Sequence, residues 1–295
     1  MSQTCTISTE AIKVGLTSLG GTLTSVADAE GTEYLWQGDA TYWGGQAPIL
    51  FPICGSIRDD RARTQDGSEL AMPRHGLVRK REWELERSDE TSATFVFGSD
   101  EETLAGYPYP FTLRSRYEVS GPTLTVTYEV TNDGDRPMPF QVGGHPGFRC
   151  PFVDGDAYDD CYLEFEREET CTAPEPVTET GLIDIDVRHP VLEGTNVMPL
   201  AHELFHKDAQ ILDELVSRRV SLRSRNSEKG VELAFGDFPY LIVWSSANDG
   251  PFVALEPWVG LSTCNDEDDV FEHKRNIQVA EPGKTKSYAF TVTVL

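Results

Sequence analysis

The chain has 295 residues, of which 25 are lysine or arginine and 49 are aspartate or glutamate, so its formal net charge is −24. This acidic balance repels nucleic acid and anionic membranes, and it disfavours strongly anionic ligands unless a local basic pocket overrides it. A neutral small molecule is the ligand that the composition accommodates most easily.

The length fits two modest domains or one large all-β domain. The first ten residues show no basic region followed by an apolar run, and no apolar stretch approaches the ~18 residues that cross a bilayer. We therefore expect a soluble, cytoplasmic protein. Six cysteines are widely spaced with no Cys-x-x-Cys pair, which predicts free thiols and neither a disulfide framework nor a metal site.

Strand signals recur along the whole chain. Apolar and polar residues alternate over 111–119 and again over 124–130, which predicts strands with one dry face and one wet face. Turn signals such as Asn132-Asp133-Gly134 separate the strands. In chain order, the expected strands are residues 91–97, 111–119, 124–130, 162–165, 231–235, 240–244, 252–255 and 287–295.

Two segments differ from this pattern. Residues 201–216 carry apolar side chains roughly at helical spacing, which predicts a helix. Residues 171–197, rich in Pro, Glu and Thr, indicate a long surface excursion. Without repeats, linkers or alternation of strands with helices, the sequence predicts a single domain over residues 1–295, all-β, with large antiparallel sheets packed face to face.

One histidine stands in tightly constrained backbone. Gly143 and Gly144 allow conformations closed to other residues, and Pro146 pushes His145 towards an extended conformation. The imidazole is either a structural corner satisfied by backbone carbonyls or a group that gives and takes a proton near neutral pH.

A carboxylate stands in a comparable place. Glu256 follows four apolar residues at a strand end that Pro257 is expected to terminate. It is either solvated or, if buried beside Trp258, a base with a raised pKa. His75, between Arg74 and Gly76, is likewise a hydrogen-bond donor in a pocket or a surface loop residue.

These segments together resemble the aldose 1-epimerase (galactose mutarotase) family over most of the chain. The blocks around Trp36 and Leu204-Phe205 resemble a less characterised branch more than a typical galactose mutarotase. The resemblance rests on Tyr34-Leu35-Trp36-Gln37-Gly38, Tyr42-Trp43, Leu50-Phe51-Pro52, Pro73-Arg74-His75-Gly76-Leu77-Val78-Arg79, Trp83, residues 132–140, Gly144-His145-Pro146-Gly147-Phe148, Leu204-Phe205, Asp208-Ala209, Glu256-Pro257-Trp258, Gly260-Leu261-Ser262 and Pro282-Gly283.

The resemblance implies a galactose mutarotase-like supersandwich, a large antiparallel β-sandwich in which a sugar lies across a sheet in an open cleft. It places His145 on the general acid, Glu256 on the general base and His75 on a second histidine that hydrogen-bonds the sugar. Interconversion of sugar anomers needs one acid and one base at the anomeric centre. We therefore expect no cofactor, no metal and a small-molecule sugar as partner.

The chain also departs from the family pattern. Ser56 stands where related sequences usually carry a sugar-binding arginine, and Arg58 is the candidate to replace it. Asp208 is either a hydroxyl acceptor in the pocket or a helix-surface residue. Trp258 and Trp36 either stack on a sugar or pack in the core.

Three alternatives compete with a 1-epimerase of a neutral aldohexose. A hexose 6-phosphate 1-epimerase needs a cationic patch, for which the sequence offers Arg74, Arg79, Lys80 and Arg81. A sugar-binding protein without turnover needs neither the acid nor the base. A glycosidase ordinarily needs two carboxylates, of which the resemblance supplies one.

Overall fold

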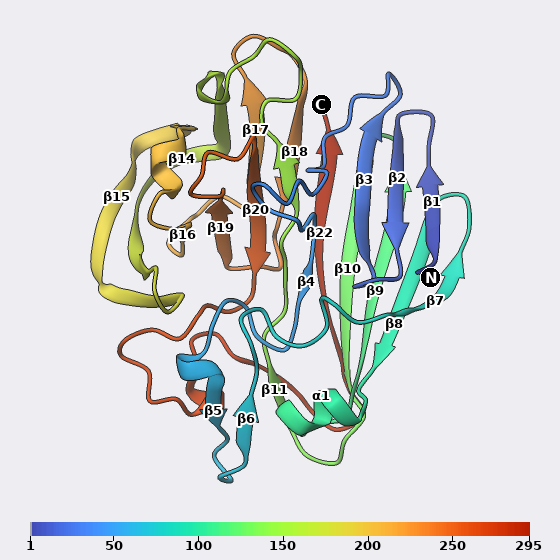
Figure 1. The fold of residues 1–295 in the computed structure, drawn as a ribbon, viewed down its shortest axis with the longest axis vertical. Helices are drawn as coiled ribbons and strands as arrows, with labels where there is room; N and C mark the ends of the chain where they lie inside the picture. The colour runs from blue at the N-terminus through green and yellow to red at the C-terminus, as the bar shows by residue number, and fades with distance from the viewer. Residues whose placement is uncertain (1) are drawn as a thin grey trace.

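A computed structural model describes residues 2–295, and large antiparallel sheets dominate it (Figure 1). The largest sheet has nine strands in the order β15 (Leu182–Pro199), β14 (Cys161–Val177), β17 (Arg219–Ser224), β18 (Gly230–Ala234), β22 (Thr285–Val294), β10 (Thr123–Asn132), β9 (Phe111–Ser120), β8 (Ser92–Gly98) and β7 (Glu84–Ser88). The all-β prediction is confirmed.

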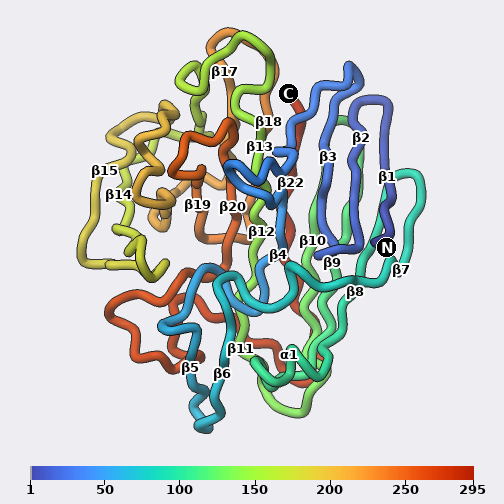
Figure 2. Tube along the Cα trace, in the orientation of Figure 1, coloured from blue at the N-terminus to red at the C-terminus, as the bar shows by residue number. Residues whose placement is uncertain are grey.

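A six-stranded sheet faces part of this large sheet. Its order is β16 (Gln210–Leu212), β19 (Tyr240–Trp244), β20 (Phe252–Trp258), β12 (Gly143–Gly144) and β4 (Ile49–Leu50), with β13 (Gly147–Arg149) also paired to β20. A three-stranded sheet of β1 (Thr4–Ser8), β2 (Ile12–Thr17) and β3 (Thr22–Asp28) lies beside it, against β8 and β9 (Figure 2). The second layer of the sandwich is therefore divided between two sheets.

The remaining elements are short. Two ribbons pair β5 (Arg61–Arg63) with β6 (Glu69–Ala71), and β11 (Met138–Phe140) with β21 (Gln278–Ala280). The helical pieces are α1 (Glu101–Gly106) and the 3-10 turns η1 (Arg58–Asp60), η2 (Tyr158–Asp160), η3 (His202–Phe205) and η4 (Phe271–His273). Among residues 2–295, no helix is long and apolar enough to cross a membrane.

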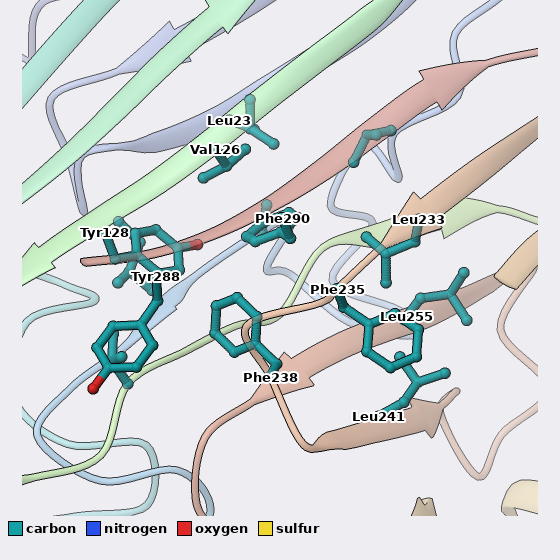
Figure 3. Close-up of a cluster of buried hydrophobic side chains, with 14 of the residues drawn as sticks. Leu23, Val126, Tyr128, Leu233, Phe235, Phe238, Leu241, Leu255, Tyr288 and Phe290 are labelled. Atoms are coloured by element: carbon teal, nitrogen blue, oxygen red, sulfur yellow. The ribbon is translucent and has the colours of Figure 1, made fainter. Parts of the chain in front are cut away.

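The apolar residues of the alternating pattern seen in the sequence form the dry interior of the sandwich. Along β9 and β10, alternate side chains are buried and their neighbours are partly exposed. Figure 3 shows the inner face of the large sheet, with Val126, Leu233 and Phe290, meeting Leu241 and Leu255 from the six-stranded sheet. Burying apolar area in this way contributes roughly 25 cal/mol per Å².

The helix predicted over residues 201–216 is wrong. This segment contains only η3 and the strand β16, which pairs with β19 at the edge of the six-stranded sheet. Both faces of β16 are covered, so Ile211 and Leu212 are both buried although they point to opposite sides. When both faces of a strand are buried, adjacent residues are apolar, and this pattern resembles the spacing of apolar residues in a helix.

The long excursion predicted over residues 171–197 does lie at the surface, but the expectation that it is irregular is wrong. These residues belong to the paired strands β14 and β15, whose ladder contains several register shifts. β15 is the edge of the nine-stranded sheet and much of it is exposed. Edge strands tolerate the proline and charged residues that a central strand excludes, which explains the composition.

Candidate active site

The outer face of the six-stranded sheet forms the floor of a cavity. Because side chains alternate along a strand, Leu241 and Leu255 point into the core, whereas Ile242 and Glu256 point the other way. The cavity has a volume of about 680 Å³. Its lining includes Tyr42, Trp43, Arg74, His75, Arg79, His145, Pro176, Thr178, Gly181, Asp208, Ile211, Ile242, Trp244, Glu256, Trp258 and Ser262.

The strand register brings His145 and Glu256 together. The chain from β12 to β13 runs antiparallel to β20, with Gly143 opposite Trp258 and Gly147 opposite Ala254. The residue midway between these glycines, His145, therefore lies opposite Glu256. His145 falls in the short break between β12 and β13, so its side chain is placed by sheet geometry and not by a free loop.

The expectation that Pro257 ends the strand is wrong. β20 runs through to Trp258, and Pro257 pairs with Leu241 of β19. On the other side of β20, the pairing with β13 ends at Ala254 and the pairing with β12 resumes at Trp258. Pro257 falls in this gap, where a missing backbone N–H breaks no ladder bond.

The two glycines before His145 serve a different purpose from the one expected. Neither has the positive φ that would require glycine. A Cβ on Gly143 would instead lie 2.8 Å from the Trp258 ring, and a Cβ on Gly144 would lie 3.0 Å from the Tyr128 hydroxyl. The glycines are needed because other side chains approach the backbone closely.

His145 and Glu256 form a buried pair. Nε2 of His145 lies 3.3 Å from Oε2 of Glu256, and the two residues are 6% and 2% exposed. Burial lowers the pKa of His145 to about 3 and raises the pKa of Glu256 well above its usual range. The neutral pair and the imidazolium–carboxylate pair contain the same number of protons, so one proton moved between the partners interconverts them.

His75 stands next to this pair in a strained conformation. Its φ is 68°, in the left-handed region that favours glycine. Its N–H donates to the carbonyl of Gly55 at 2.7 Å, and the Gly55 N–H donates to Nδ1 of His75 at 3.2 Å. Burial and the neighbouring His145 hold the pKa of His75 well below its usual range. In the neutral ring the proton is therefore on Nε2, a hydrogen-bond donor.

Charged side chains line one wall. The nearest oxygen of Asp208 is 3.5 Å from the Arg74 guanidinium. Half-buried Arg79 also lines the cavity, and its side chain has no ion pair or hydrogen-bond partner within residues 2–295. The other two basic residues considered for a cationic patch, Lys80 and Arg81, are not in the cavity lining. Lys80 is exposed, and Arg81 pairs with Asp100 and Glu102.

Arg58 and Ser56 are outside the cavity lining. Nε of Arg58 lies 3.1 Å from an Asp269 oxygen, in an ion pair away from the other candidate residues. The turn between β14 and β15 covers Ser56, because a Cβ on Gly181 would lie 2.8 Å from the Ser56 hydroxyl and 3.1 Å from the Arg74 guanidinium. Arg74, and not Arg58, is the arginine that reaches the cavity beside Ser56.

Sequence reasoning assigned no role to two of the tryptophans that surround His145. The Trp43 ring stacks on the imidazole with 4.7 Å between centroids and 24° between planes, and Trp244 meets it edge-on at 5.4 Å. The alternation along β19 could have indicated Trp244, but no local pattern indicates Trp43. Trp258 lines the cavity with its buried Nε1 unpartnered among the described residues. Trp36, expected beside the sugar or in the core, is buried and stacks on Phe252 with 4.9 Å between ring centroids.

A two-layered antiparallel sandwich with a buried imidazole–carboxyl pair at the floor of a cavity defines a galactose mutarotase-like protein. The chain belongs to the aldose 1-epimerase family, whose model matches residues 3–278. The chain is 45% identical over 297 residues to the chromosomal protein LacX of Lactococcus lactis subsp. lactis, with 99% of each chain covered. This similarity agrees with the expected branch.

Solved structures support the same assignment. The galactose mutarotase related enzyme of Lactobacillus acidophilus is 31% identical, with a TM-score of 0.93 and coverage of 99% of this chain and 97% of that one. A galactose mutarotase-like protein of Lactobacillus casei is 29% identical, with a TM-score of 0.90 and coverage of 99% and 100%. The predicted fold is thus confirmed, and the family supports an epimerase role.

Proposed function

We propose that this protein is a cofactor-free aldose 1-epimerase that interconverts the α and β anomers of an aldohexose. The observation that carries the proposal is the buried His145–Glu256 pair, 3.3 Å apart and facing a cavity of about 680 Å³. This volume falls in the range of roughly 300–1,000 Å³ typical of small-molecule sites. The cavity is therefore large enough for a monosaccharide.

In the proposed reaction the ionised Glu256 removes the proton of the C1 hydroxyl while protonated His145 gives a proton to the ring oxygen. The bond between C1 and the ring oxygen breaks, and its electron pair stays on that oxygen as C1 becomes an aldehyde. Rotation about C1–C2 presents the other face of the aldehyde. The new hydroxyl attacks C1, returns its proton to His145, and Glu256 protonates the former carbonyl oxygen.

The geometry suits this exchange because the two reacting oxygens are bonded to the same carbon. An acid and a base within hydrogen-bond distance of each other can therefore reach both oxygens of one anomeric centre. In the proposal, Nε2 of His75 and the carboxylate of Asp208 bind sugar hydroxyls, and Trp258 lies against the sugar. Arg58 is left out of the proposed site because its guanidinium pairs with Asp269.

The test is anomer exchange followed by NMR or polarimetry with wild type, E256Q and H145N. Each substitution removes one proton transfer, so kcat is expected to fall about 10²- to 10⁴-fold while weak sugar binding remains. Full exchange in either variant contradicts the mechanism. Sugar binding without exchange in the wild type indicates instead a sugar-binding protein on this fold.

One observation favours a second candidate, a hexose 6-phosphate 1-epimerase. Arg79 presents to the cavity a half-buried guanidinium that has no partner among residues 2–295, and burial together with the nearby charge of Arg74 lowers its pKa. A cation held in this way is stabilised by an anionic group on a ligand. A panel of free aldoses and their 6-phosphates distinguishes the candidates, because the first predicts a higher kcat/KM for the free sugar and the second for the phosphate.

A further inference from the structure

The imidazole of His145 lacks the hydrogen bond that usually orients a catalytic histidine. Nε2 faces Glu256, but Nδ1 is buried and has no hydrogen-bond partner of good geometry within the described part of the chain; the main-chain carbonyl of His145 itself only raises the pKa of the ring. In most acid/base sites a carbonyl or carboxylate holds the second ring nitrogen and fixes the ring. Something else must hold His145.

Aromatic rings surround the imidazole on the sides that Glu256 leaves free. Trp43 stacks on its face, while Trp244 and His75 meet it nearly perpendicular, at 84° and 79°. Trp43 is in turn stacked on Phe252, with 5.5 Å between centroids. The imidazole is therefore at the end of a column of stacked rings that begins in the core.

Trp43 is itself held firmly, although it comes from a loop. The Trp36 indole N–H donates to the Trp43 carbonyl at 2.8 Å, and the Trp43 N–H donates to the Asp39 carbonyl at 2.8 Å. A Cβ on Gly45 would lie 2.7 Å from the indole, and one on Gly147 would lie 2.8 Å from it. The absence of side chains at both glycines leaves the space that the Trp43 ring fills.

We propose that Trp43 is a positioning residue that holds the imidazole of His145 in its reactive orientation by ring stacking, in place of a hydrogen bond to Nδ1. This inference rests on the proposed epimerase function. An aromatic face also stabilises a cation, so the indole supports the imidazolium that must deliver the proton.

The charges around His145 make this support useful. The charged or titratable groups that act on His145 are Glu256 from β20, and His75, Arg74 and Arg79 from the segment that follows β6. Burial and the two arginines all disfavour the imidazolium. The main-chain carbonyl of His145 itself raises the pKa of the ring, and Glu256 and the face of Trp43 are placed to favour the imidazolium as well.

The experiment compares W43L, W43F and G45A with the wild type. W43L keeps an apolar side chain but removes the ring, so kcat is expected to fall about 10- to 100-fold, as small misplacements of a catalytic group do. W43F keeps a stacked ring and should retain kcat within about threefold. G45A displaces the indole without removing it and should lower kcat at least about threefold, which decides the question even if W43L does not fold.

A second measurement needs no activity. In ¹⁵N spectra of the sugar-free protein near neutral pH, a held His145 ring gives the two distinct nitrogen shifts of a single tautomer. In W43L and G45A the shifts are expected to converge as tautomers mix. W83F, which alters a buried tryptophan outside the cavity lining, is the control and should keep wild-type kcat and wild-type His145 signals.

Two results would overturn the inference. If W43L and G45A raise KM while kcat stays at the wild-type value, Trp43 is a platform for the sugar and not a positioning residue. Unchanged single-tautomer signals in both variants also contradict it. Absence of anomer exchange in the wild type would refute the proposed function instead, and the spectra would still decide the role of Trp43.

Discussion

Glu256 and His145 occupy opposite positions on two antiparallel segments, with 3.3 Å between Oε2 and Nε2. Because each partner is buried, the pair is stable in the neutral form, and the charged form that the proposed reaction uses arises by moving one proton across this distance. The pair therefore titrates as a whole, and its apparent pKa values belong to both residues together.

The pH dependence of kcat/KM should be bell-shaped and unusually broad. Activity falls on the acid side when both partners carry a proton, and the lowered pKa of His145 places this limb below the usual imidazole range. It falls on the alkaline side when the pair loses its shared proton, and the raised pKa of Glu256 places this limb above the usual carboxyl range. Initial rates corrected for spontaneous anomer exchange test this from pH 4 to 10. An acid limb near the ordinary imidazole value of about 6.5 would contradict it.

E256Q should be more stable than the wild type at pH 8. A raised pKa in the folded state means that the folded chain binds more protons than the unfolded chain between the unfolded and the folded pKa of Glu256. The free energy of unfolding therefore falls as the pH rises through this window, with a limiting slope of about 1.4 kcal/mol per pH increment of one. Glutamine removes the titration, so the difference in Tm between variant and wild type should be large at pH 8 and small at pH 4.

H145N provides the matched control with the opposite sign. The pKa of His145 is lowered to about 3 in the folded state, so the folded chain binds fewer protons than the unfolded chain between this value and the ordinary imidazole value of about 6.5. The free energy of unfolding is therefore highest above this window and falls as the pH falls through it. H145N should therefore gain stability over the wild type towards acid pH. The same pH trend in both variants would contradict the opposite pKa changes of the two partners.

W258F should move only the alkaline limb of the pH profile. The indole N–H of Trp258 is buried, and its proximity lowers the pKa of Glu256. Phenylalanine removes this N–H, so the carboxylate loses stabilisation and the alkaline limb should move upward. A movement of the acid limb instead would place the indole effect on His145.

R79Q should distinguish anionic from neutral substrates. If the guanidinium binds a phosphate, the substitution lowers kcat/KM for an aldose 6-phosphate by at least about tenfold, because charged hydrogen bonds contribute about 1.5–3 kcal/mol. The kcat/KM for the free aldose should stay within about twofold. K80Q, at an exposed position outside the cavity lining, is the control and should leave both ratios unchanged. Equal losses for both substrates in R79Q would exclude phosphate recognition by Arg79.

G143A should destabilise the fold by about 1–3 kcal/mol. The added methyl would lie 2.8 Å from the Trp258 ring and 3.0 Å from the thiol of Cys54, in a region where nothing can move aside easily. G98A is the matched control, because a Cβ on Gly98 of β8 meets no atom within 4 Å. Chemical denaturation should show a change within about 0.5 kcal/mol for G98A, and an equally small change for G143A would contradict the close packing.

Much of the fold could be predicted from the sequence because strands such as β9 and β10 bury one face and expose the other, which gives an alternating pattern of apolar and polar residues. The pattern failed at Ile211 and Leu212, where a strand has two buried faces, and along the edge strand β15. Local spacing cannot locate residues that meet only through sheet pairing. His145 and Glu256 were connected by resemblance and by residue type, and the register supplies their physical connection.

The loops around the cavity were harder to predict. Trp43 and Arg79 reach the cavity through backbone that has no periodic pattern, and Arg58 was a sugar-binding candidate only because it follows Ser56 by two residues. The assignment of the acid, the base and the sugar-binding residues stays a prediction until activity is measured. The single domain over residues 1–295 is also still a prediction.

The residues around the break between β12 and β13 and the residues in the walls of the cavity are held in place in different ways. The acid and the base are fixed by the pairing of the sheet that forms the floor, whereas Arg74, Asp208 and the turn after β14 contact the cavity from segments outside that pairing. Substitutions in these walls can alter which sugar fits without altering the distance between His145 and Glu256. Mutagenesis aimed at a new sugar should therefore begin in the walls, with the floor left intact.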